Sequence, residues 1–253
     1  MKPHIKLATA QTADGGRMEL YQHDRDFLIK INGQGLMYSR RHESEKELAR
    51  LGCAHLSTHE APRVLIGGLG MGYTLRQTLD MLGPNATVVV SELLSAVVDW
   101  NRDYLKGLNG QPLDDKRTQL IIGDIFPLIA QSSSRFDAIL LDVDNGPSAI
   151  TDSGNQRLYS QGGIQACRRA LRKSGSLAIW SAEPSKGFEQ LLMNCGFHVR
   201  RYKGKAHKDG NSKPLYIWVA AEDESILPPL AASHTHQTRK SRGAVPDKLD
   251  EKN

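Results

Sequence analysis

Short apolar runs alternate with amphipathic segments through the middle of the chain. Five such runs, each followed by a stretch with helical spacing of apolar residues, lie at 64–66, 87–90, 119–122, 138–141 and 176–180. Strands without a polar face are typical of a parallel sheet that helices cover on both sides. The pattern therefore predicts an α/β, doubly wound, mostly parallel sheet.

The end of this region breaks the alternation. Two apolar stretches, 197–202 and 215–220, are joined by the polar loop KGKAHKDGNSK, which has no helical pattern. Strands joined without a crossover helix pair antiparallel. We therefore expect a seven-stranded sheet that ends in an antiparallel C-terminal edge hairpin.

The chain begins with a different pattern. Short alternating stretches at 19–22, 27–31 and 35–39 surround the dipeptide Asn32-Gly33, which is typical of a hairpin turn. A helix is expected over 43–51, ending at Gly52. These features predict a small N-terminal β-domain.

Three regions follow from these patterns. We expect the small β-domain over residues 1–42 and a Rossmann-type catalytic domain over 43–221. Residues 222–253 contain two consecutive prolines, few large apolar residues and mixed charge, so we expect them to form a disordered tail.

Composition narrows the class of protein. The 253 residues carry 33 Lys+Arg against 28 Asp+Glu, a formal charge of +5, with a mean hydropathy of −0.44. No apolar run is long enough for a membrane span, and the first residues lack the apolar stretch of a signal peptide. Three distant cysteines (Cys53, Cys167 and Cys195) without a C-x-x-C pair predict neither a disulfide framework nor a metal site. A soluble, cytoplasmic protein is the expectation.

The most informative motif is VLIGGLGMGYT, in which glycines 67, 68, 70 and 72 follow a strand and precede a helix. Glycines there let the backbone approach a ligand closely and present free N–H groups at a helix N-terminus. A tight strand-to-helix turn without a ligand is the structural alternative, because short motifs of this kind also arise by chance.

Carboxylates follow the neighbouring strands. Glu92 lies 25 positions after the first glycine (92 − 67), close to the spacing at which an acid binds the ribose hydroxyls of a nucleotide. Asp124 follows the third predicted strand, and Asp142 and Asp144 follow the fourth. Four carboxylates gathered at one edge of the sheet would repel each other unless a cationic or hydrogen-bond-donating ligand lies among them. Surface acids without a ligand are the alternative.

With these motifs, the chain resembles the spermidine synthase family of polyamine aminopropyltransferases, which have the class I S-adenosylmethionine-dependent methyltransferase fold and a small N-terminal β-domain. The resemblance runs from residue 19 to about 220. The stretches that carry it are LIKINGQGLMYS, ELARL, VLIGGLGMGYTLRQTL, VVVSEL, IIGDIF, FDAILLDVDNGP and LYSQGGIQACRRALRKSGSLAIW.

The resemblance implies a role for each matching residue. The glycine loop (Gly68, Gly70, Met71 and Gly72) would line the nucleoside, Glu92 would hold the ribose, and Asp124 with Ile125 would face the adenine. Asp142 takes the place of the family's catalytic aspartate, and we interpret it as the base, supported by Asp144. A role for Asp142 in holding only the ligand or its own loop stays open. The resemblance also implies a homodimer.

Four departures separate the chain from the family. The loop aspartate that contacts the donor's amine is Met71 here, and the β-domain glutamine is Met37. The connecting helix has no tyrosine in its segment 44–47, and the family's later tyrosine is absent near Gly163 and Ile164. Loss of the loop carboxylate removes the discrimination against the carboxylate of intact S-adenosylmethionine. We therefore expect methyl transfer to an unidentified small-molecule acceptor, in preference to aminopropyl transfer from decarboxylated S-adenosylmethionine.

Basic residues in the closing hairpin also bear on the substrate. They are Arg200, Arg201, Lys203, Lys205, Lys208 and Lys213. A site for polycationic amines should be acidic, so a basic substrate patch would argue against a polyamine. A solvated edge that discourages strand aggregation is the preferred interpretation.

Other functions remain as alternatives. A nucleoside-binding protein without catalysis would fit the retained and lost residues. An RNA methyltransferase or RNA binder is disfavoured by the 6% aromatic content, because single-strand binders stack bases on aromatic rings. An NAD-binding Rossmann domain is disfavoured by the closing hairpin. Tyr73, Tyr159 and Trp180 could line an acceptor pocket, with core packing the preferred role for Trp180.

Overall fold

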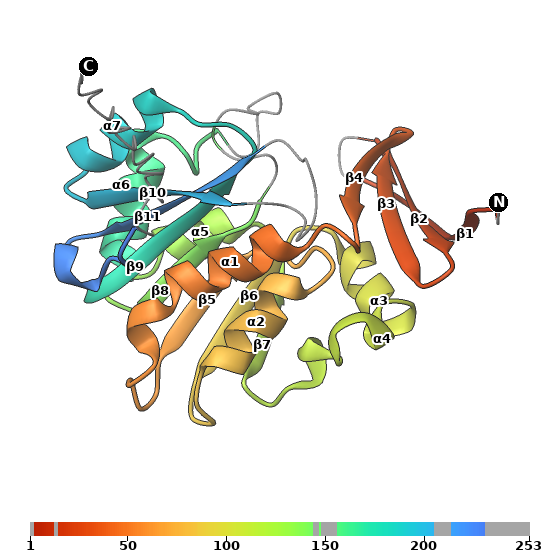
Figure 1. Cartoon of the computed structure of the whole chain (residues 1–253), viewed down its shortest axis with the longest axis horizontal. Coiled ribbons are helices and arrows are strands. Elements are labelled where there is room, and N and C mark those ends of the chain that lie inside the picture. The colour runs from red at the N-terminus through yellow and green to blue at the C-terminus, as the bar shows by residue number, and fades with distance from the viewer. Residues whose placement is uncertain (1–2, 13–14, 144–146, 148–155, 205–213, 231–253) are drawn as a thin grey trace, which may run out of the picture.

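The computed structural model describes residues 3–12, 15–143, 147, 156–204 and 214–230. Two β-sheets organise this part of the chain, a small N-terminal sheet and a larger sheet flanked by helices (Figure 1). Asp144 and residues 231–253, most of the predicted tail, lie outside the described residues.

The N-terminal sheet is antiparallel throughout. Its four strands, paired in chain order, are β1 (Ile5–Gln11), β2 (Arg17–His23), β3 (Asp26–Ile31) and β4 (Gln34–Tyr38). Asn32 and Gly33 join β3 to β4 with positive φ angles of 49° and 80°, which is the hairpin geometry expected of this dipeptide. Three of the strands match the predicted ones, and β1 is an additional strand.

The large sheet has seven strands in the order β10-β11-β9-β8-β5-β6-β7. Strands β9, β8, β5, β6 and β7 run parallel, whereas β11 pairs antiparallel with both β9 and β10. This confirms the predicted mostly parallel sheet with its C-terminal edge hairpin. The strands are β5 (Arg63–Gly67), β6 (Thr87–Glu92), β7 (Thr118–Ile122), β8 (Phe136–Leu141), β9 (Leu171–Ser181), β10 (His198–Gly204) and β11 (Leu215–Ala221).

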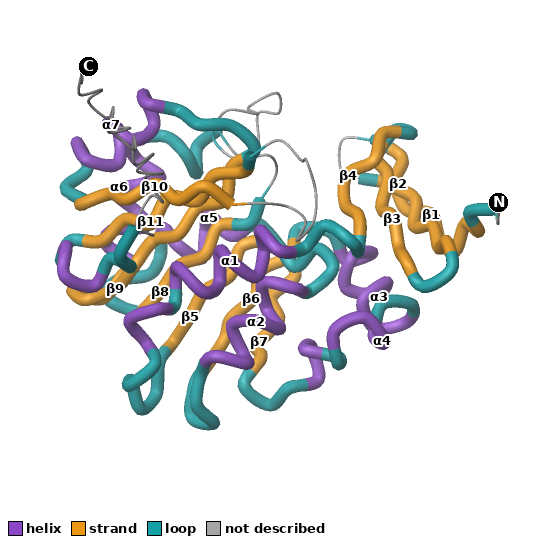
Figure 2. Tube along the Cα trace, in the orientation of Figure 1, coloured by secondary structure: helices purple, strands orange, loops and turns teal. Residues whose placement is uncertain are grey.

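Helices cover both faces of this sheet (Figure 2). The α-helices are α1 (Glu43–Gly52), α2 (Tyr73–Met81), α3 (Ser95–Asp103), α4 (Lys106–Asn109), α5 (Ile125–Ala130), α6 (Gln161–Ala170) and α7 (Lys186–Asn194). Three 3-10 turns lie at η1 (Ala54–Leu56), η2 (Pro112–Asp114) and η3 (Glu224–Ile226). No helix in the described ranges is long and apolar enough to cross a membrane.

Two apolar clusters show how the layers pack. Leu48 of α1, Leu75 of α2 and Val98 of α3 are buried in one cluster with Val64 and other strand residues. The helices α5, α6 and α7 contribute to a second cluster on the opposite face, which contains Leu65. Successive residues of a strand point to opposite faces, so a strand between two helix layers must be apolar at every position. That requirement explains the uninterrupted apolar runs in the sequence.

Short polar side chains set the starts of three helices. Asp124, Ser160 and Ser185 each accept a hydrogen bond from a backbone N–H in the first turn of α5, α6 and α7, at 2.8, 3.2 and 3.2 Å. Such N-caps satisfy donors that have no partner inside the helix. The capping residues define where each of these helices begins.

Candidate active site

The carboxyl ends of four adjacent strands bring the predicted site residues together. The order β8-β5-β6-β7 places Asp142, the glycine loop, Glu92 and Asp124 side by side along one edge. Backbone hydrogen bonds fasten this row: the N–H of Asp142 donates to Gly67 at 2.9 Å, and the N–H of Gly123 donates to Glu92 at 2.8 Å. The structure therefore gathers three of the four predicted carboxylates at one sheet edge.

The glycine loop adopts a conformation that side chains would obstruct. Gly68 has a φ of +87°, and a Cβ there would lie 2.3 Å from the backbone oxygen of Asp142. Gly72, with a φ of +81°, is the N-cap residue of α2. A Cβ on Gly72 would lie 2.7 Å from the Asn109 side chain, so both glycines let the loop pack closely against its neighbours.

Two asparagines hold the loop from α3 and α4. Asn101 donates to the carbonyl of Gly70 at 2.8 Å, and Asn109 donates to the carbonyl of Met71 at 2.5 Å. Asn101 is only 7% exposed. Sequence reasoning missed both residues, although a buried amide on an otherwise apolar helix face is a signal for Asn101.

Glu92 is bound by the backbone around it. One carboxylate oxygen accepts a hydrogen bond from the N–H of Leu69, and the other accepts from the N–H of Leu94, both at 2.9 Å. Glu92 thus ties the glycine loop to the start of α3. A ribose contact by this residue stays a prediction.

Both carboxylate oxygens of Asp124 have partners within the protein. One caps α5 through the N–H of Phe126, and the other forms an ion pair with Arg157. The Arg157 guanidinium lies 4.9 Å from the centroid of the Phe126 ring, and Ile125 is buried. Arg157 was not a predicted site residue, because only the folded chain brings it to Asp124. An adenine contact by Asp124 and Ile125 likewise stays a prediction.

Asp142 is held by a threonine of α2. The Thr74 hydroxyl donates to the Asp142 carboxylate at 2.6 Å and lies 3.4 Å from the backbone oxygen of Glu45 on α1. Burial raises the pKa of Asp142 to about 6, against the effect of the Thr74 hydrogen bond. Burial and then the charge of Asp142 raise the pKa of Glu45 to about 7. Two carboxylates, one on α1 and one directly after β8, therefore interact beside the glycine loop.

Cations near this carboxyl pair have other partners. His42 and Lys46 both pair with Glu43, at 3.4 and 3.6 Å. The Glu45 carboxylate accepts a hydrogen bond from the Ser44 hydroxyl at 2.5 Å. None of the ion pairs found among the described residues involves Glu45 or Asp142. The local charge is negative and suits a cation that the ligand brings.

Met37 and Met71 stand where the resemblance implies polar residues. Met37 lies beside the glycine loop, and Met71 lies within it. Met71 is 4% exposed and belongs to the apolar core. The Met37 sulfur on β4 lies 3.4 Å from the position that a Cβ on Gly70 would take, so the N-terminal sheet reaches the glycine loop. Both residues contribute apolar surface where the family has polar groups.

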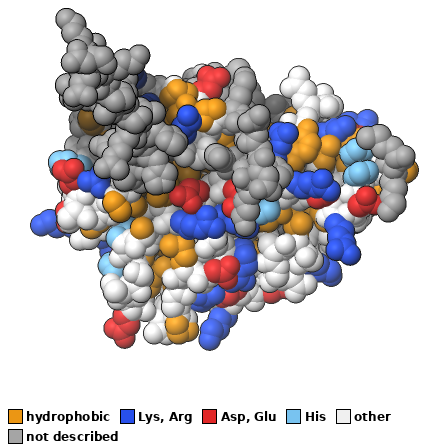
Figure 3. Space-filling view, in the orientation of Figure 1, with side chains coloured by type: hydrophobic (Ala, Val, Ile, Leu, Met, Phe, Trp, Pro, Cys, Tyr) orange, Lys and Arg blue, Asp and Glu red, His pale blue; other side chains and the backbone are white. Residues whose placement is uncertain are grey.

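The arginines of the C-terminal edge hairpin, formed by β10 and β11, make contacts within the protein. Arg200 donates to the carbonyls of Leu227 and Pro228 at 2.8 and 3.1 Å, and Arg201 pairs with Glu189 at 3.0 Å. On the face seen in Figure 3, described basic side chains are interspersed with acidic ones. Lys205, Lys208 and Lys213 lie outside the described residues. These contacts favour a structural role for the arginines at the edge of the sheet over a role in binding substrate.

Tyr73 and Tyr159 do not form an open acceptor pocket in the described structure. Tyr73 is 8% exposed, and its hydroxyl donates to the carbonyl of Ser39 at 2.9 Å. Tyr159 is 4% exposed, packs edge-on against Phe188, and donates to the carbonyl of Val143 at 3.1 Å. Both rings are core residues.

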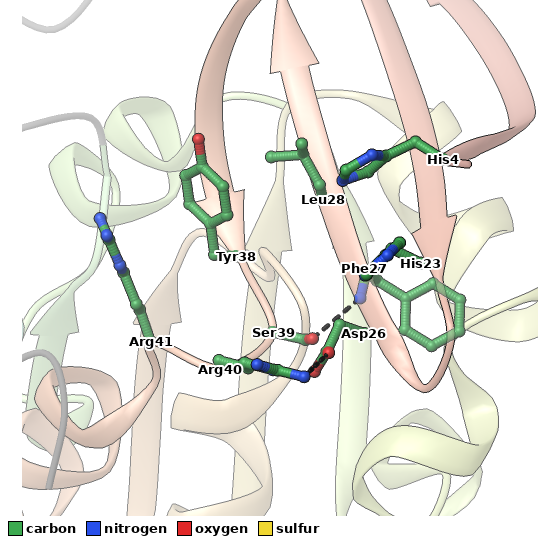
Figure 4. A pocket seen from close by; sticks show the side chains of 9 residues that line it. All are labelled: His4, His23, Asp26, Phe27, Leu28, Tyr38, Ser39, Arg40 and Arg41. Atoms are coloured by element: carbon green, nitrogen blue, oxygen red, sulfur yellow. Dashed lines mark hydrogen bonds and ion pairs between the residues drawn. The ribbon is translucent and has the colours of Figure 1, made fainter. Parts of the chain in front are cut away.

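A separate cavity of about 320 Å³ lies against the N-terminal sheet (Figure 4). Arg40, Arg41, His4 and His23 line it, and its acid, Asp26, pairs with Arg40 at 2.5 Å. The His4 and His23 rings are stacked with centroids 4.7 Å apart. This basic cavity does not suit an amine ligand, and neither Glu45 nor Asp142 lines it.

Comparisons with known proteins agree with this geometry. The family model described as the spermine/spermidine synthase domain matches residues 47–190, more than half of the chain. A polyamine aminopropyltransferase of Saccharolobus islandicus is 32% identical over 135 residues, which are 53% of this chain and 44% of the relative. Polyamine aminopropyltransferase 1 of Pseudomonas aeruginosa is 32% identical over 133 residues, 52% of this chain and 44% of the relative. The matched segment thus spans less than half the length of these relatives.

Solved structures establish the fold. A spermidine synthase in complex with the transition state analogue AdoDATO superimposes with a TM-score of 0.68 at 22% identity, covering 88% of this chain and 76% of that one. The spermidine synthase of Thermotoga maritima gives a TM-score of 0.67 at 20% identity, covering 88% and 75%. The methyltransferase-like fold with an N-terminal β-sheet is confirmed.

Proposed function

The chain belongs to the spermine/spermidine synthase family, and on that premise we propose that it transfers an aminopropyl group from decarboxylated S-adenosylmethionine to a small polyamine acceptor. The observation that carries the proposal is the carboxyl pair of Glu45 and Asp142 beside the glycine loop. Both substrates present a primary amine, and two carboxylates that have no cationic partner among the described residues favour such a group.

The nucleoside part of the donor suits the same sheet edge. The glycine loop offers close backbone approach, and the N-terminus of α2 offers N–H donors. Leu93 and Ile122 are 61% and 55% exposed, although both are large and apolar. They flank the carboxyl ends of β6 and β7, where an adenine ring would cover apolar surface that otherwise faces water.

The negative charge of the site also favours decarboxylated S-adenosylmethionine over intact S-adenosylmethionine as the donor. The expectation of methyl transfer rested on Met71, which lacks the family's loop carboxylate, and it overlooked Glu45 on α1. Intact S-adenosylmethionine carries a carboxylate that the negative charge of Glu45 and Asp142 would disfavour in this site, whereas the decarboxylated donor carries only cationic groups. Repulsion of the wrong ligand is an effective source of specificity. The carboxyl pair therefore favours aminopropyl transfer.

In this proposal the protein positions two amines and removes one proton. The acceptor amine must be neutral to attack the propyl carbon next to sulfur. The C–S bond breaks as the new C–N bond forms, and its electron pair stays on the sulfur of methylthioadenosine. Orientation of the reactants and a nearby base supply the catalysis. Asp142, fixed by Thr74, holds the acceptor ammonium until that proton is removed.

The test is turnover with defined substrates. Decarboxylated S-adenosylmethionine and putrescine should yield methylthioadenosine and a product heavier by one aminopropyl group, as detected by mass spectrometry. The variant Asp142→Asn should bind methylthioadenosine normally and lose turnover. Methylthioadenosine binding without any turnover of amines would instead support the non-catalytic alternative. A homodimer, expected from the family, stays a prediction.

A further inference from the structure

A second cavity lies at the edge of the large sheet opposite the candidate active site. Ser134, which precedes β8, and Leu171, which begins β9, both line it, so it faces the amino ends of these parallel strands. Its volume of about 310 Å³ lies within the range of small-molecule sites. Leu171 and Phe197 are buried and form an apolar floor, whereas the exposed side chains around it include four cations, Arg168, Arg169, Arg172 and Lys173. The proposed function gives this cavity no role.

We propose that this cavity binds an oligophosphate, an anion in which two or more phosphate groups are linked. A free oligophosphate and the phosphate chain of a nucleotide share this chemistry. The site is separate from the transfer reaction proposed for the glycine loop and does not depend on it.

The cavity carries an excess of positive charge. Its described lining holds one acid, Glu222, against the four cations. Glu222 forms an ion pair with Arg168. Arg169 and Lys173 form no ion pair with any described residue. These two cations are therefore available to an anionic ligand.

Further arginines extend the positive charge along the amino ends of neighbouring strands. Arg135 precedes β8, and Arg63 begins β5, which pairs with β8. Arg172 has a counterion in Asp137, which is 5% exposed and lies 2.7 Å from it. The pKa of Arg63 is nevertheless lowered, first by burial and then by the positive charges of Arg135 and Arg172. Positive charge thus prevails around the cavity and favours an anion with several charges over a single carboxylate.

The lining also provides the donors that phosphate oxygens need. The guanidinium group of an arginine can bond two phosphate oxygens at once, and the ammonium group of a lysine adds a mobile point charge. The hydroxyls of Ser133 and Ser134, from the turn before β8, line the cavity as further donors. This combination of two free cations, paired arginines and hydroxyls around an apolar floor suits linked phosphate groups.

Helix stability offers an ordinary explanation for some of these basic residues. Arg168 and Arg169 occupy the last turn of α6, where cations interact favourably with the helix C-terminus. The last carbonyls of α6, however, already have backbone partners. The N–H groups of Ser134 and Arg135 donate to the carbonyls of Arg169 and Ala170, both at 2.8 Å. The end of α6 therefore needs no cap from the Arg169 side chain, which leaves its role at the cavity unexplained by helix stability.

The experiment titrates tripolyphosphate calorimetrically into wild type and into the variants Arg169→Gln and Lys173→Gln, at physiological salt. The matched control is Arg41→Gln, which removes the same charge from the basic cavity at the N-terminal sheet (Figure 4). Orthophosphate, ATP and a single-stranded oligothymidylate are titrated for comparison. A further titration of tripolyphosphate is made in the presence of methylthioadenosine.

Wild type and Arg41→Gln should bind one tripolyphosphate per chain with equal affinity. Arg169→Gln and Lys173→Gln should each raise the Kd roughly 10-fold or more, because each loses a charged hydrogen-bond donor. Orthophosphate should bind more weakly than tripolyphosphate, and methylthioadenosine should not displace it. ATP that binds as tightly as tripolyphosphate would support recognition of the phosphate chain alone, and tighter binding of ATP would identify a nucleotide as the ligand.

Three results would overturn the proposal. Affinities for tripolyphosphate in Arg169→Gln and Lys173→Gln equal to that of wild type would exclude this cavity, and an equal loss in Arg41→Gln would show attraction to net charge only. Displacement by methylthioadenosine would place the anion at the glycine loop instead. Tighter binding of the oligothymidylate than of tripolyphosphate and ATP would indicate a nucleic-acid surface. None of these readouts requires turnover, so a failure of the proposed transfer reaction leaves the test intact.

Discussion

The Thr74 hydroxyl donates a 2.6 Å hydrogen bond to the carboxylate of Asp142, which lies 68 residues further along the chain. Thr74 belongs to α2, directly after the glycine loop, and Asp142 follows β8. The bond therefore couples the loop that would hold the donor to the carboxylate that would hold the acceptor. Their relative position is fixed before either substrate binds.

Replacing Thr74 by Val should raise the pKa of Asp142, because the hydrogen bond stabilises the ionised carboxylate. A hydrogen bond to a charged group contributes about 1.5–3 kcal/mol, so kcat/KM for the amine should fall roughly 10- to 100-fold near pH 6 and recover in part at higher pH. The control is Thr78→Val, since the Thr78 hydroxyl bonds the Thr74 carbonyl at 2.8 Å within the helix. An identical pH profile for Thr74→Val and wild type would contradict this role.

Replacing Glu92 by Gln should weaken nucleoside binding by disturbing the loop. The carboxylate accepts from both Leu69 and Leu94, whereas the amide keeps one acceptor oxygen and would point an N–H₂ group at one of these donors. Methylthioadenosine affinity should fall at least 10-fold, together with a lower melting temperature. Calorimetric titration and thermal unfolding measure both effects. Unchanged affinity would show that Glu92 holds neither loop nor ribose.

A methyl group at Gly68 should disrupt the site directly. In Gly68→Ala the new Cβ would meet the Asp142 backbone oxygen, and the φ of +87° is unfavourable for alanine. We expect a lower melting temperature and loss of methylthioadenosine binding. Gly83→Ala is the matched control, because a Cβ at Gly83 has no atom within 4 Å. Equal behaviour of the two variants would count against the geometry of the loop.

Stability should depend on pH through the carboxyl pair. The pKa of Glu45 rises from 4.5 to about 7 and that of Asp142 from 3.8 to about 6, so between these values the folded state holds more protons than the unfolded chain. Their contribution is present in full below pH 4 and is lost as the pH rises to 7. Urea unfolding at pH 5 and pH 8 should show a smaller loss of stability on raising the pH in Glu45→Gln than in wild type. Equal losses would contradict the coupling.

Much of the fold could be predicted from the sequence because the central strands are buried on both faces. Every residue of β8 is buried, and the apolar run shows it. Strand β1 escaped prediction because none of its residues is buried and no alternating pattern marks it. It is recognisable as a strand only through its pairing with β2.

The site residues that directly follow a strand could be predicted from the sequence. Glu92, Asp124 and Asp142 each follow a strand, and the topology rule for open sheets places them together. Glu45 could not be placed in this way, since its position depends on how α1 packs beside α2 and β8. The sequence showed only that a tyrosine is missing from 44–47, and the folded chain shows which residue of this segment interacts with Asp142. Asn101, Asn109 and Arg157 were missed for the same reason, because their contacts depend on how separate parts of the chain pack together.

A donor competition tests aminopropyl transfer most directly. Equal concentrations of S-adenosylmethionine and decarboxylated S-adenosylmethionine are incubated with the protein and putrescine, and the nucleoside products are separated by chromatography. We expect methylthioadenosine and an aminopropylated amine, with S-adenosylhomocysteine at background level. Accumulation of S-adenosylhomocysteine with a methylated amine would contradict the proposed function and establish methyl transfer.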